Sequence, residues 1–132
     1  MGWAGLIFAF STNEFAGEET AGFIIPILSA LFPSAGPREL QSLHYAVRKA
    51  AHFTEYLILS VLLYRALRGT ERWNFRAATL ALVVSALYAA SDELHQLFVP
   101  GRTAAAADCL IDVSGAAAGQ GLVAARARVQ RR

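Results

Sequence analysis

Charged and imidazole side chains occur in three segments of this chain that are otherwise apolar. In chain order these residues are Lys49, His52, Glu55, Asp92, Glu93, His95, Asp108 and Asp112. Carboxylates and imidazoles that lie close together can act as general acids and bases, or can hold a divalent cation and its bound water. Lysine and arginine can instead bind a phosphate or a carboxylate. Which of these kinds of chemistry is available depends on the elements that hold the residues.

Composition excludes several classes of protein. The 132 residues include 22 charged ones (12 Lys+Arg and 10 Asp+Glu), or 17%, against about 25% in ordinary soluble domains. A hydrophobic content of 55% excludes a disordered chain, and the length predicts one domain over residues 1–132. The basic residues occur in short, separate clusters, so we expect no nucleic-acid partner. Because Cys109 is the only cysteine, an intramolecular disulfide and a cysteine-rich zinc site are excluded.

Long apolar segments predict an all-α integral membrane protein. Residues 53–67 and 73–98 are mostly apolar, and the second segment would extend about 39 Å as a helix, enough to cross a bilayer. Residues 113–125 become long enough if Asp108 and Asp112 lie within the same helix. Residues 1–10 resemble the second half of a further span, so we expect a bundle of about four spans with the first truncated. The alternative is a soluble all-α domain, but residues 77–91 lack the polar face that a soluble helix needs.

Basic residues predict the orientation of these spans. One group of arginines lies at the end of residues 53–67 and beyond it, and another ends the chain: Arg65, Arg68, Arg72, Arg76, Arg126, Arg128, Arg131 and Arg132. Short loops rich in Lys and Arg stay in the cytoplasm, so both termini are expected inside and residues 11–48 outside. Residues 21–32 are apolar but contain Pro26, which predicts an interfacial or re-entrant helix. Trp3 is expected in an interfacial belt of aromatic side chains.

In this topology the polar residues fall at one depth, near the outer ends of three spans. Lys49, His52 and Glu55 recur every third residue along one helix, and Asp108 and Asp112 are four residues apart on another. An ionised side chain in hydrocarbon costs about 2.5 to 3.5 kcal/mol, so we expect these side chains to face inward and to pair with one another. The alternative is a network that only holds the helices together, with Asp108 as a helix cap.

Small residues in the apolar segments predict close helix packing. Gly115 and Gly119 form a GxxxG pattern, which brings helices together either within one chain or in a dimer, and we favour packing within the chain. Four serines lie in apolar segments and are expected to be packing residues and not nucleophiles: Ser60, Ser85, Ser91 and Ser114.

Three stretches of sequence, in this order, carry a resemblance to a known family. They are KAAHFTEYLILSVLLYRAL (49–67), SALYAASDELHQLFVPGR (85–102) and DCLIDVSGAAAG (108–119), and together they resemble the VanZ-like family of small bacterial membrane proteins. IFAFS (7–11) is similar to the end of that family's first span. The resemblance implies a multi-pass protein of the bacterial inner membrane that acts in the cell envelope, in the context of low-level resistance to the glycopeptide teicoplanin. It implies no particular reaction and no cofactor.

Three kinds of function remain open for the polar residues. The first is an outward-facing pocket, within the lipid bilayer, for an amphiphile such as a lipid-linked cell-wall precursor or a lipoglycopeptide. Its expected ligand-binding residues are Lys49, His52, Glu55, Asp92, Glu93, His95, Gln96, Arg102, Asp108 and Asp112. The second is a membrane hydrolase or transferase, with or without a metal ion, whose candidate catalytic residues are Glu55, Asp92, Glu93 and His95. The third is a structural membrane protein without catalysis.

Overall fold

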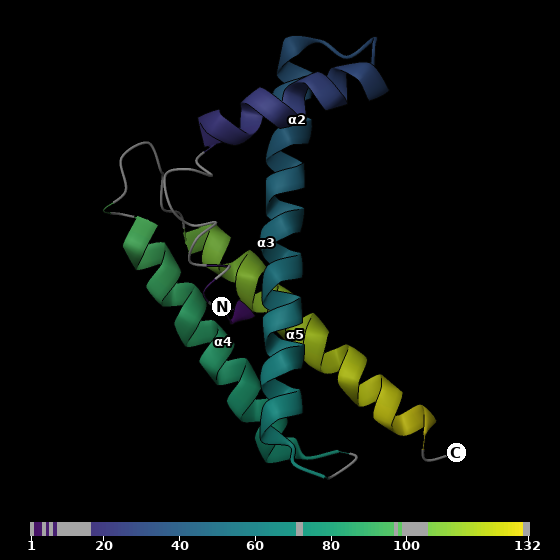
Figure 1. Ribbon diagram of the computed structural model, residues 1–132, viewed down its shortest axis with the longest axis vertical. Helices are drawn as coiled ribbons and strands as arrows, with labels where there is room; N and C mark the ends of the chain where they lie inside the picture. The colour runs from purple at the N-terminus through teal and green to yellow at the C-terminus, as the bar shows by residue number, and fades with distance from the viewer. Residues whose placement is uncertain are drawn as a thin grey trace.

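Helices make up the regular structure of this chain. The structure is a computed structural model, and it describes residues 2, 3, 5, 7, 17–70, 73–96, 98 and 106–130. The four labelled helices are α2 (Gly17–Leu31), α3 (Pro37–Leu67), α4 (Phe75–Gln96) and α5 (Ala106–Val129) (Figure 1). No strand occurs among the described residues. The all-α class predicted from the sequence is therefore confirmed.

A single long helix organises the other elements. α3 has 31 residues and would be about 46 Å long. α4 and α5 pack against its C-terminal half and against each other, whereas α2 lies across its N-terminal end (Figure 1). α3 and α5 run in the same direction and α4 runs in the opposite direction. The three-helix part of the molecule therefore begins near the middle of α3.

The ends of α3 and α4 are set by local hydrogen bonds. Pro37 is the first residue of α3, and the backbone N–H of Gly36 donates to Glu39 Oε2 at 2.8 Å. Gly69 follows α3 with a φ of +61°, a conformation that glycine adopts without steric cost at the end of a helix. Asn74 caps α4 by accepting a hydrogen bond from the N–H of Ala77 at 3.0 Å.

α2 is the helix expected to be interfacial or re-entrant. Pro26 lies within α2 and does not end it. Thr20 Oγ1 lies 3.2 Å from His44 Nε2 and links α2 to α3. Burial, with a smaller contribution from the nearby Arg48, lowers the pKa of His44, so its ring is neutral at pH 7. The outer face of α2 leaves Phe23 exposed, together with Ile27 and Leu31.

α4 is packed in the opposite way to a helix of a soluble protein. Its buried residues are mostly small: Ala77, Ala78, Ala81, Ser85 and Ala89. Most of its large apolar residues are exposed: Phe75, Leu80, Val83, Val84, Leu87 and Leu94. Among the described helices, this one alone is long and apolar enough to cross a membrane, over Phe75–His95, and only 33% of that stretch is buried. A core helix of a soluble protein would be mostly buried, so the exposed apolar face favours contact with lipid.

α5 approaches α3 closely along its glycines. A Cβ atom on Gly115 would collide with the backbone carbonyl of Phe53, and one on Gly119 would lie 2.7 Å from Leu57 O. The two helix backbones are therefore in direct contact at these positions. The GxxxG pattern packs within the chain, as the sequence analysis favoured.

The glycine contact leads to a first prediction. Gly115→Ala should destabilise the protein by about 1 to 3 kcal/mol, because the new methyl group would push α5 away from α3. Gly121→Ala is the matched control, because a Cβ atom on Gly121 has no neighbour within 4 Å among the described residues. Thermal unfolding of the detergent-purified proteins measures the difference. Equal unfolding temperatures for the two variants would contradict the close contact.

Candidate functional site

Three of the predicted polar residues meet between α3, α4 and α5. His52, Asp92 and Asp112 each offer one side-chain ligand atom, and these three atoms lie within 4.8 Å of one another. His52 Nδ1 is 3.6 Å from Asp112 Oδ1. The carboxylates are deeply buried, with Asp92 5% exposed and Asp112 2% exposed. We call these three residues the His–Asp–Asp cluster.

Helix periodicity explains why these three residues come together. Asp92 continues the buried small-residue face of α4, three residues after Ala89 and seven after Ser85. Asp112 lies one turn before Gly115 on α5, and His52 directly precedes Phe53 on α3, the residue that Gly115 contacts. The backbone contact between α3 and α5 therefore fixes the separation of His52 and Asp112.

An ion pair lies about one turn closer to the N-terminal ends of α3 and α5 than the His–Asp–Asp cluster. Lys49 Nζ pairs with Asp108 Oδ1, and both side chains are about one-fifth exposed. Lys49 Nζ also lies 4.8 Å from the centroid of the Tyr45 ring, at cation–π distance. Asp108 lies within the first turn of α5, and its carboxylate pairs with α3. The helix-cap interpretation of Asp108 is therefore wrong, because α5 begins two residues earlier and the carboxylate is used between helices.

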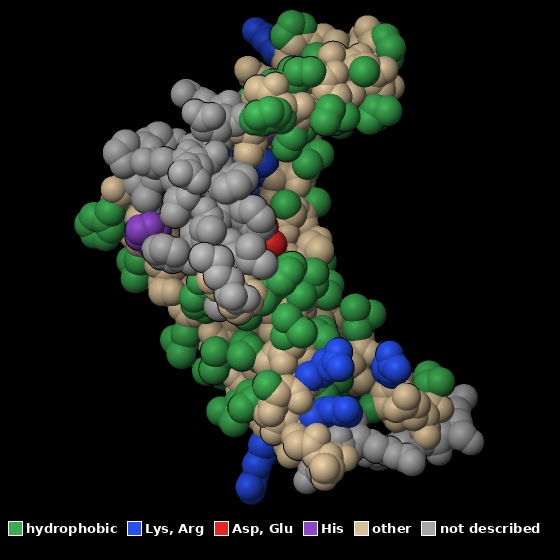
Figure 2. Space-filling view, in the orientation of Figure 1, with side chains coloured by type: hydrophobic (Ala, Val, Ile, Leu, Met, Phe, Trp, Pro, Cys, Tyr) green, Lys and Arg blue, Asp and Glu red, His purple; other side chains and the backbone are tan. Residues whose placement is uncertain are grey.

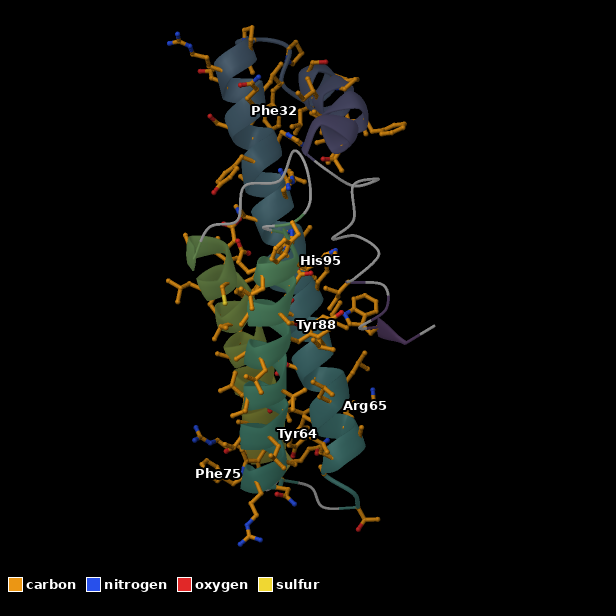
Figure 3. The ribbon with its side chains drawn as sticks, turned by 90° about the vertical axis from the view of Figure 1, so that its left-hand side faces the viewer. Phe32, Tyr64, Arg65, Phe75, Tyr88 and His95 are labelled. Carbon is orange, nitrogen blue, oxygen red and sulfur yellow. The ribbon has the colours of Figure 1, made fainter. Side chains whose placement is uncertain are left out.

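The remaining ionisable candidates surround this cluster. Glu55, Glu93 and His95 are half-buried, and each takes part in an interaction within the structure. The charges of Glu55 and Glu93 act on Asp112, together with those of Asp92 and Asp108. Figure 3 shows His95 near the C-terminal end of α4, beyond Tyr88. Within the described residues, however, none of these three joins the group of ligand atoms.

Two predicted ligand-binding residues cannot be placed. Gln96 is the last residue of α4, but its side chain lies outside the described residues, and so does all of Arg102. Their roles stay predictions.

Tyr56 is a residue of the site that the polar pattern alone did not select. It is 0% exposed, and its hydroxyl interacts electrostatically with Asp92 and Asp112. Its ring centroid is 6.3 Å from that of Tyr88. Tyr56 OH and Asp112 Oδ1 are both buried without a hydrogen-bond partner in the described part of the chain. The family resemblance included Tyr56, but a tyrosine in an apolar helix gives no signal of its own.

Trp3 and Ile7, which precede the four helices, lie beside this site. Trp3 Nε1 donates a hydrogen bond to the backbone carbonyl of Glu55 at 3.0 Å. Ile7 is 2% exposed and packs with Tyr56 and Leu59. Trp3 is thus partly buried and hydrogen-bonded to α3, and its place in an interfacial belt stays a prediction.

A second polar contact joins α3 and α5 further along the bundle. Ser60 Oγ donates to Ala116 O at 2.9 Å, and Gln120 Nε2 donates to Ser60 O at 2.9 Å and to Ser60 Oγ at 2.6 Å. Ser60 and Gln120 are both buried. Ser60 is thus a packing residue, as expected, whereas Gln120 was missed because a single amide in an apolar segment has no distinctive pattern.

The opposite end of the bundle is basic. A cavity of about 330 Å³ lies there, at the C-terminal ends of α3 and α5. It is lined by three arginines and four other residues: Arg65, Arg68, Arg126, Val61, Tyr64, Val123 and Gln130. Figure 2 shows Lys and Arg side chains gathered at this end. Arginines are therefore concentrated at this end, whereas the carboxylates of the His–Asp–Asp cluster lie towards the other end, where Lys49 also lies.

Comparison with known families places the chain. A family model described as VanZ/LLP1 matches residues 1–127. The chain belongs to the VanZ/LLP1 family. The predicted VanZ-like relationship is confirmed, and the match extends over every residue of the His–Asp–Asp cluster and over the Lys49–Asp108 pair. No curated protein and no solved structure matches the chain.

The Ser60–Gln120 contact yields a second prediction. Ser60→Ala should cost about 1 to 3 kcal/mol of stability, because it removes one donor and one acceptor from a buried set of hydrogen bonds. Ser114→Ala is the control, since the Ser114 hydroxyl is exposed and bonds only to Ile111 O of its own helix. We expect that variant to change stability by less than about 0.5 kcal/mol. Thermal unfolding in detergent tests this, and an unchanged midpoint for Ser60→Ala would contradict it.

Proposed function

We propose that this VanZ/LLP1-family chain is a multi-pass protein of the bacterial inner membrane. In this arrangement the C-terminal half of α3, together with α4 and α5, crosses the bilayer. The N-terminal segment contributes part of a fourth span, and α2 lies at the outer surface with Phe23 and Ile27 in the head-group region. Support comes from the exposed apolar face of α4 and from the glycine contact between α3 and α5.

The separation of charge supports an orientation for this arrangement. Arg65, Arg68 and Arg126 lie at one end of the bundle, which the positive-inside rule places in the cytoplasm. Along α4, Asp92 lies roughly 25 Å from Phe75, close to the thickness of the hydrocarbon core. The His–Asp–Asp cluster then lies near the head groups of the outer leaflet.

Cysteine labelling gives a third prediction, for this topology. In a Cys109→Ser background, Ser34→Cys should react with a membrane-impermeant maleimide on intact spheroplasts, because the turn between α2 and α3 would lie outside. Gln130→Cys should react only after permeabilisation, because the end of α5 would be cytoplasmic. Both positions are exposed in the structure, so accessibility of the side chain itself is matched. Labelling of both positions on intact spheroplasts would contradict the topology.

We propose further that the polar residues at the outer end form a binding site for an amphiphile of the cell envelope. The class we favour is a lipid-linked cell-wall precursor, or a lipoglycopeptide with an acyl chain. The observation that carries this proposal is the burial of Asp92 and Asp112 beside His52. Ionisable side chains buried in a membrane protein are costly and mark ligand or ion sites by default. Lys49 and Arg102 would meet the phosphate or carboxylate, and the apolar face of α2 would lie along the lipid tail.

A second candidate is a membrane hydrolase or transferase, and the composition of the cluster favours it. One imidazole beside two carboxylates can remove a proton from water and return it to a leaving oxygen. Such an enzyme would split a phosphoester or an ester of the bound amphiphile at the His–Asp–Asp cluster. Of the catalytic candidates taken from the sequence, Asp92 belongs to this cluster, whereas Glu55, Glu93 and His95 lie outside it. Release of the phosphate or acid from a labelled substrate by purified protein would separate this function from binding alone.

Antibiotic susceptibility provides a fourth prediction. A sensitive host that expresses the wild-type protein should become less susceptible to teicoplanin than to vancomycin. Glu55→Gln and Glu93→Gln should abolish this shift at unchanged membrane abundance, because the amides retain shape but lose charge. Ser91→Ala, an exposed change on α4 that leaves every carboxylate in place, is the control and should keep the shift.

The outcomes of this experiment separate the alternatives. A purely structural role predicts that phenotype and abundance fall together in the two glutamine variants. No shift with well-inserted wild-type protein would contradict a role in glycopeptide resistance. Photo-crosslinking from position 102 to a labelled lipid-linked precursor, in intact membranes, then tests ligand binding directly, and absence of an adduct would contradict it.

A further inference from the structure

We infer that His52, Asp92 and Asp112 form a binding site for one divalent transition-metal cation, of the Zn²⁺ or Mn²⁺ type. The inference deepens the proposed function and rests on it in one respect: the cation would lie where the head group of the amphiphile is proposed to bind.

The geometry of the cluster fits such a cation. Two ligands held about 2.1 Å from one ion at a tetrahedral angle lie roughly 3.4 Å apart. His52 Nδ1 and Asp112 Oδ1 are 3.6 Å apart, and all three ligand atoms lie within 4.8 Å of one another. Small side-chain rotations that shift each ligand atom by about 1 Å or less would therefore bring the three atoms to bonding distance from one ion. Three protein ligands also leave a coordination position open.

The types of the donor atoms indicate which ions would bind. Imidazole nitrogen suits zinc and other transition metals, while carboxylate oxygen also suits manganese and magnesium. A site with one His52 nitrogen and two carboxylate oxygens therefore favours Zn²⁺ or Mn²⁺. Calcium is less suitable, because it takes six to eight oxygen ligands in most sites.

The negative charge of the carboxylates in and around the cluster favours the binding of a cation. The charges of Asp92, Glu93, Asp108 and Glu55 all act on Asp112, which is itself 2% exposed. Lys49 is paired with Asp108 and so offsets one of these carboxylates. A divalent cation bound by the cluster would balance the negative charges of both of its aspartates.

Two buried oxygen atoms make no hydrogen bond in the described part of the chain, although one of them, Asp112 Oδ1, lies 3.6 Å from His52 Nδ1. Asp112 Oδ1 and Tyr56 OH are each without a hydrogen bond in the part of the chain that the structure describes. Asp112 and Tyr56 are 2% and 0% exposed, so neither is exposed to bulk water. A cation on Asp112 Oδ1 would satisfy that atom. Tyr56 OH could then donate to a carboxylate or to a water molecule on the ion, as outer groups of metal sites do.

A cation would also explain how an acidic cluster could meet a phosphate. Without it, Asp92 and Asp112 would repel a phosphate group that approaches from the head-group region. With it, the open coordination position would accept a phosphate oxygen, while Lys49 lies one turn further out. The same ion could bind a water molecule for hydrolysis.

Metal binding by the full-length protein in detergent gives a fifth prediction. After treatment with a chelator and dialysis against Zn²⁺ or Mn²⁺ alone, the wild type should retain about one equivalent of metal by elemental analysis. Asp92→Asn and Asp112→Asn should weaken binding by more than about tenfold. Glu39→Gln is the matched control, since Glu39 is an exposed carboxylate at the far end of α3, and it should bind metal like the wild type.

A second variant keeps the test decisive if the aspartate variants fail to fold. In a Cys109→Ser background, His52→Cys loaded with Co²⁺ should show the intense near-ultraviolet band of thiolate-to-cobalt charge transfer, and the Cys109→Ser protein that keeps His52 should not. Folded wild-type protein that retains less than about a tenth of an equivalent would overturn the inference. So would metal binding by His52→Cys without the thiolate band, since the metal would then lie elsewhere.

Lipid binding is measured separately so that the two proposals can fail independently. Crosslinking from position 102 is carried out with and without chelator. An adduct that forms equally in both, in a protein without bound metal, would overturn the metal site and leave the binding function in place. Metal bound with the predicted ligands but no adduct would overturn the amphiphile function and support the metal site.

Discussion

The direct contact of two helix backbones is the constraint on which the rest of this structure depends. Gly115 lies against the carbonyl of Phe53, and Gly119 lies against that of Leu57. Because α3 and α5 run in the same direction, the alignment of the two helices at these glycines also determines which residues meet before and after them. Asp112 faces His52 ahead of the glycines, and Gln120 bonds to Ser60 beyond them. A larger residue at either glycine would separate both polar pairs at once.

α4 turns small residues toward the other helices and large apolar residues away from them. In water, a helix gains stability by burying its large apolar side chains. Lipid gives no such gain, so helices associate through close van der Waals packing and through polar contacts. Ala81, Ser85 and Ala89 accordingly face the bundle, while Leu80 and Leu87 face outward. Asp92 continues the inner face, which places one carboxylate within the cluster by the same periodicity.

The sequence predicted an apolar helix over residues 73–98, where the structure has α4 (Phe75–Gln96), and it predicted the internal role of the GxxxG pattern and the meeting of three helices. It did not predict that α3 would continue unbroken from Pro37, because its first half is polar and its second half apolar. Successive helical residues turn by about 100°, so Glu55 points some 120° away from Lys49 and Glu93 points away from Asp92. Spacing of three therefore overstated how many charges would converge. The hydrogen bonds of Trp3 and Gln120 were not predicted, because each donates to a backbone carbonyl that is more than 50 residues away in the sequence.

The two polar contacts between α3 and α5 differ in a way that bears on function. Ser60 and Gln120 are neutral, and their hydrogen bonds already hold the helices together deep in the bundle. Interhelical hydrogen bonds of this kind need no ionised group. The His–Asp–Asp cluster adds two buried carboxylates to the same interface, at a much larger desolvation cost and with an oxygen of Asp112 lacking a hydrogen bond among the described residues. Helix association alone gives no reason for that cost, whereas the proposed binding of a ligand or a cation by these side chains would give one.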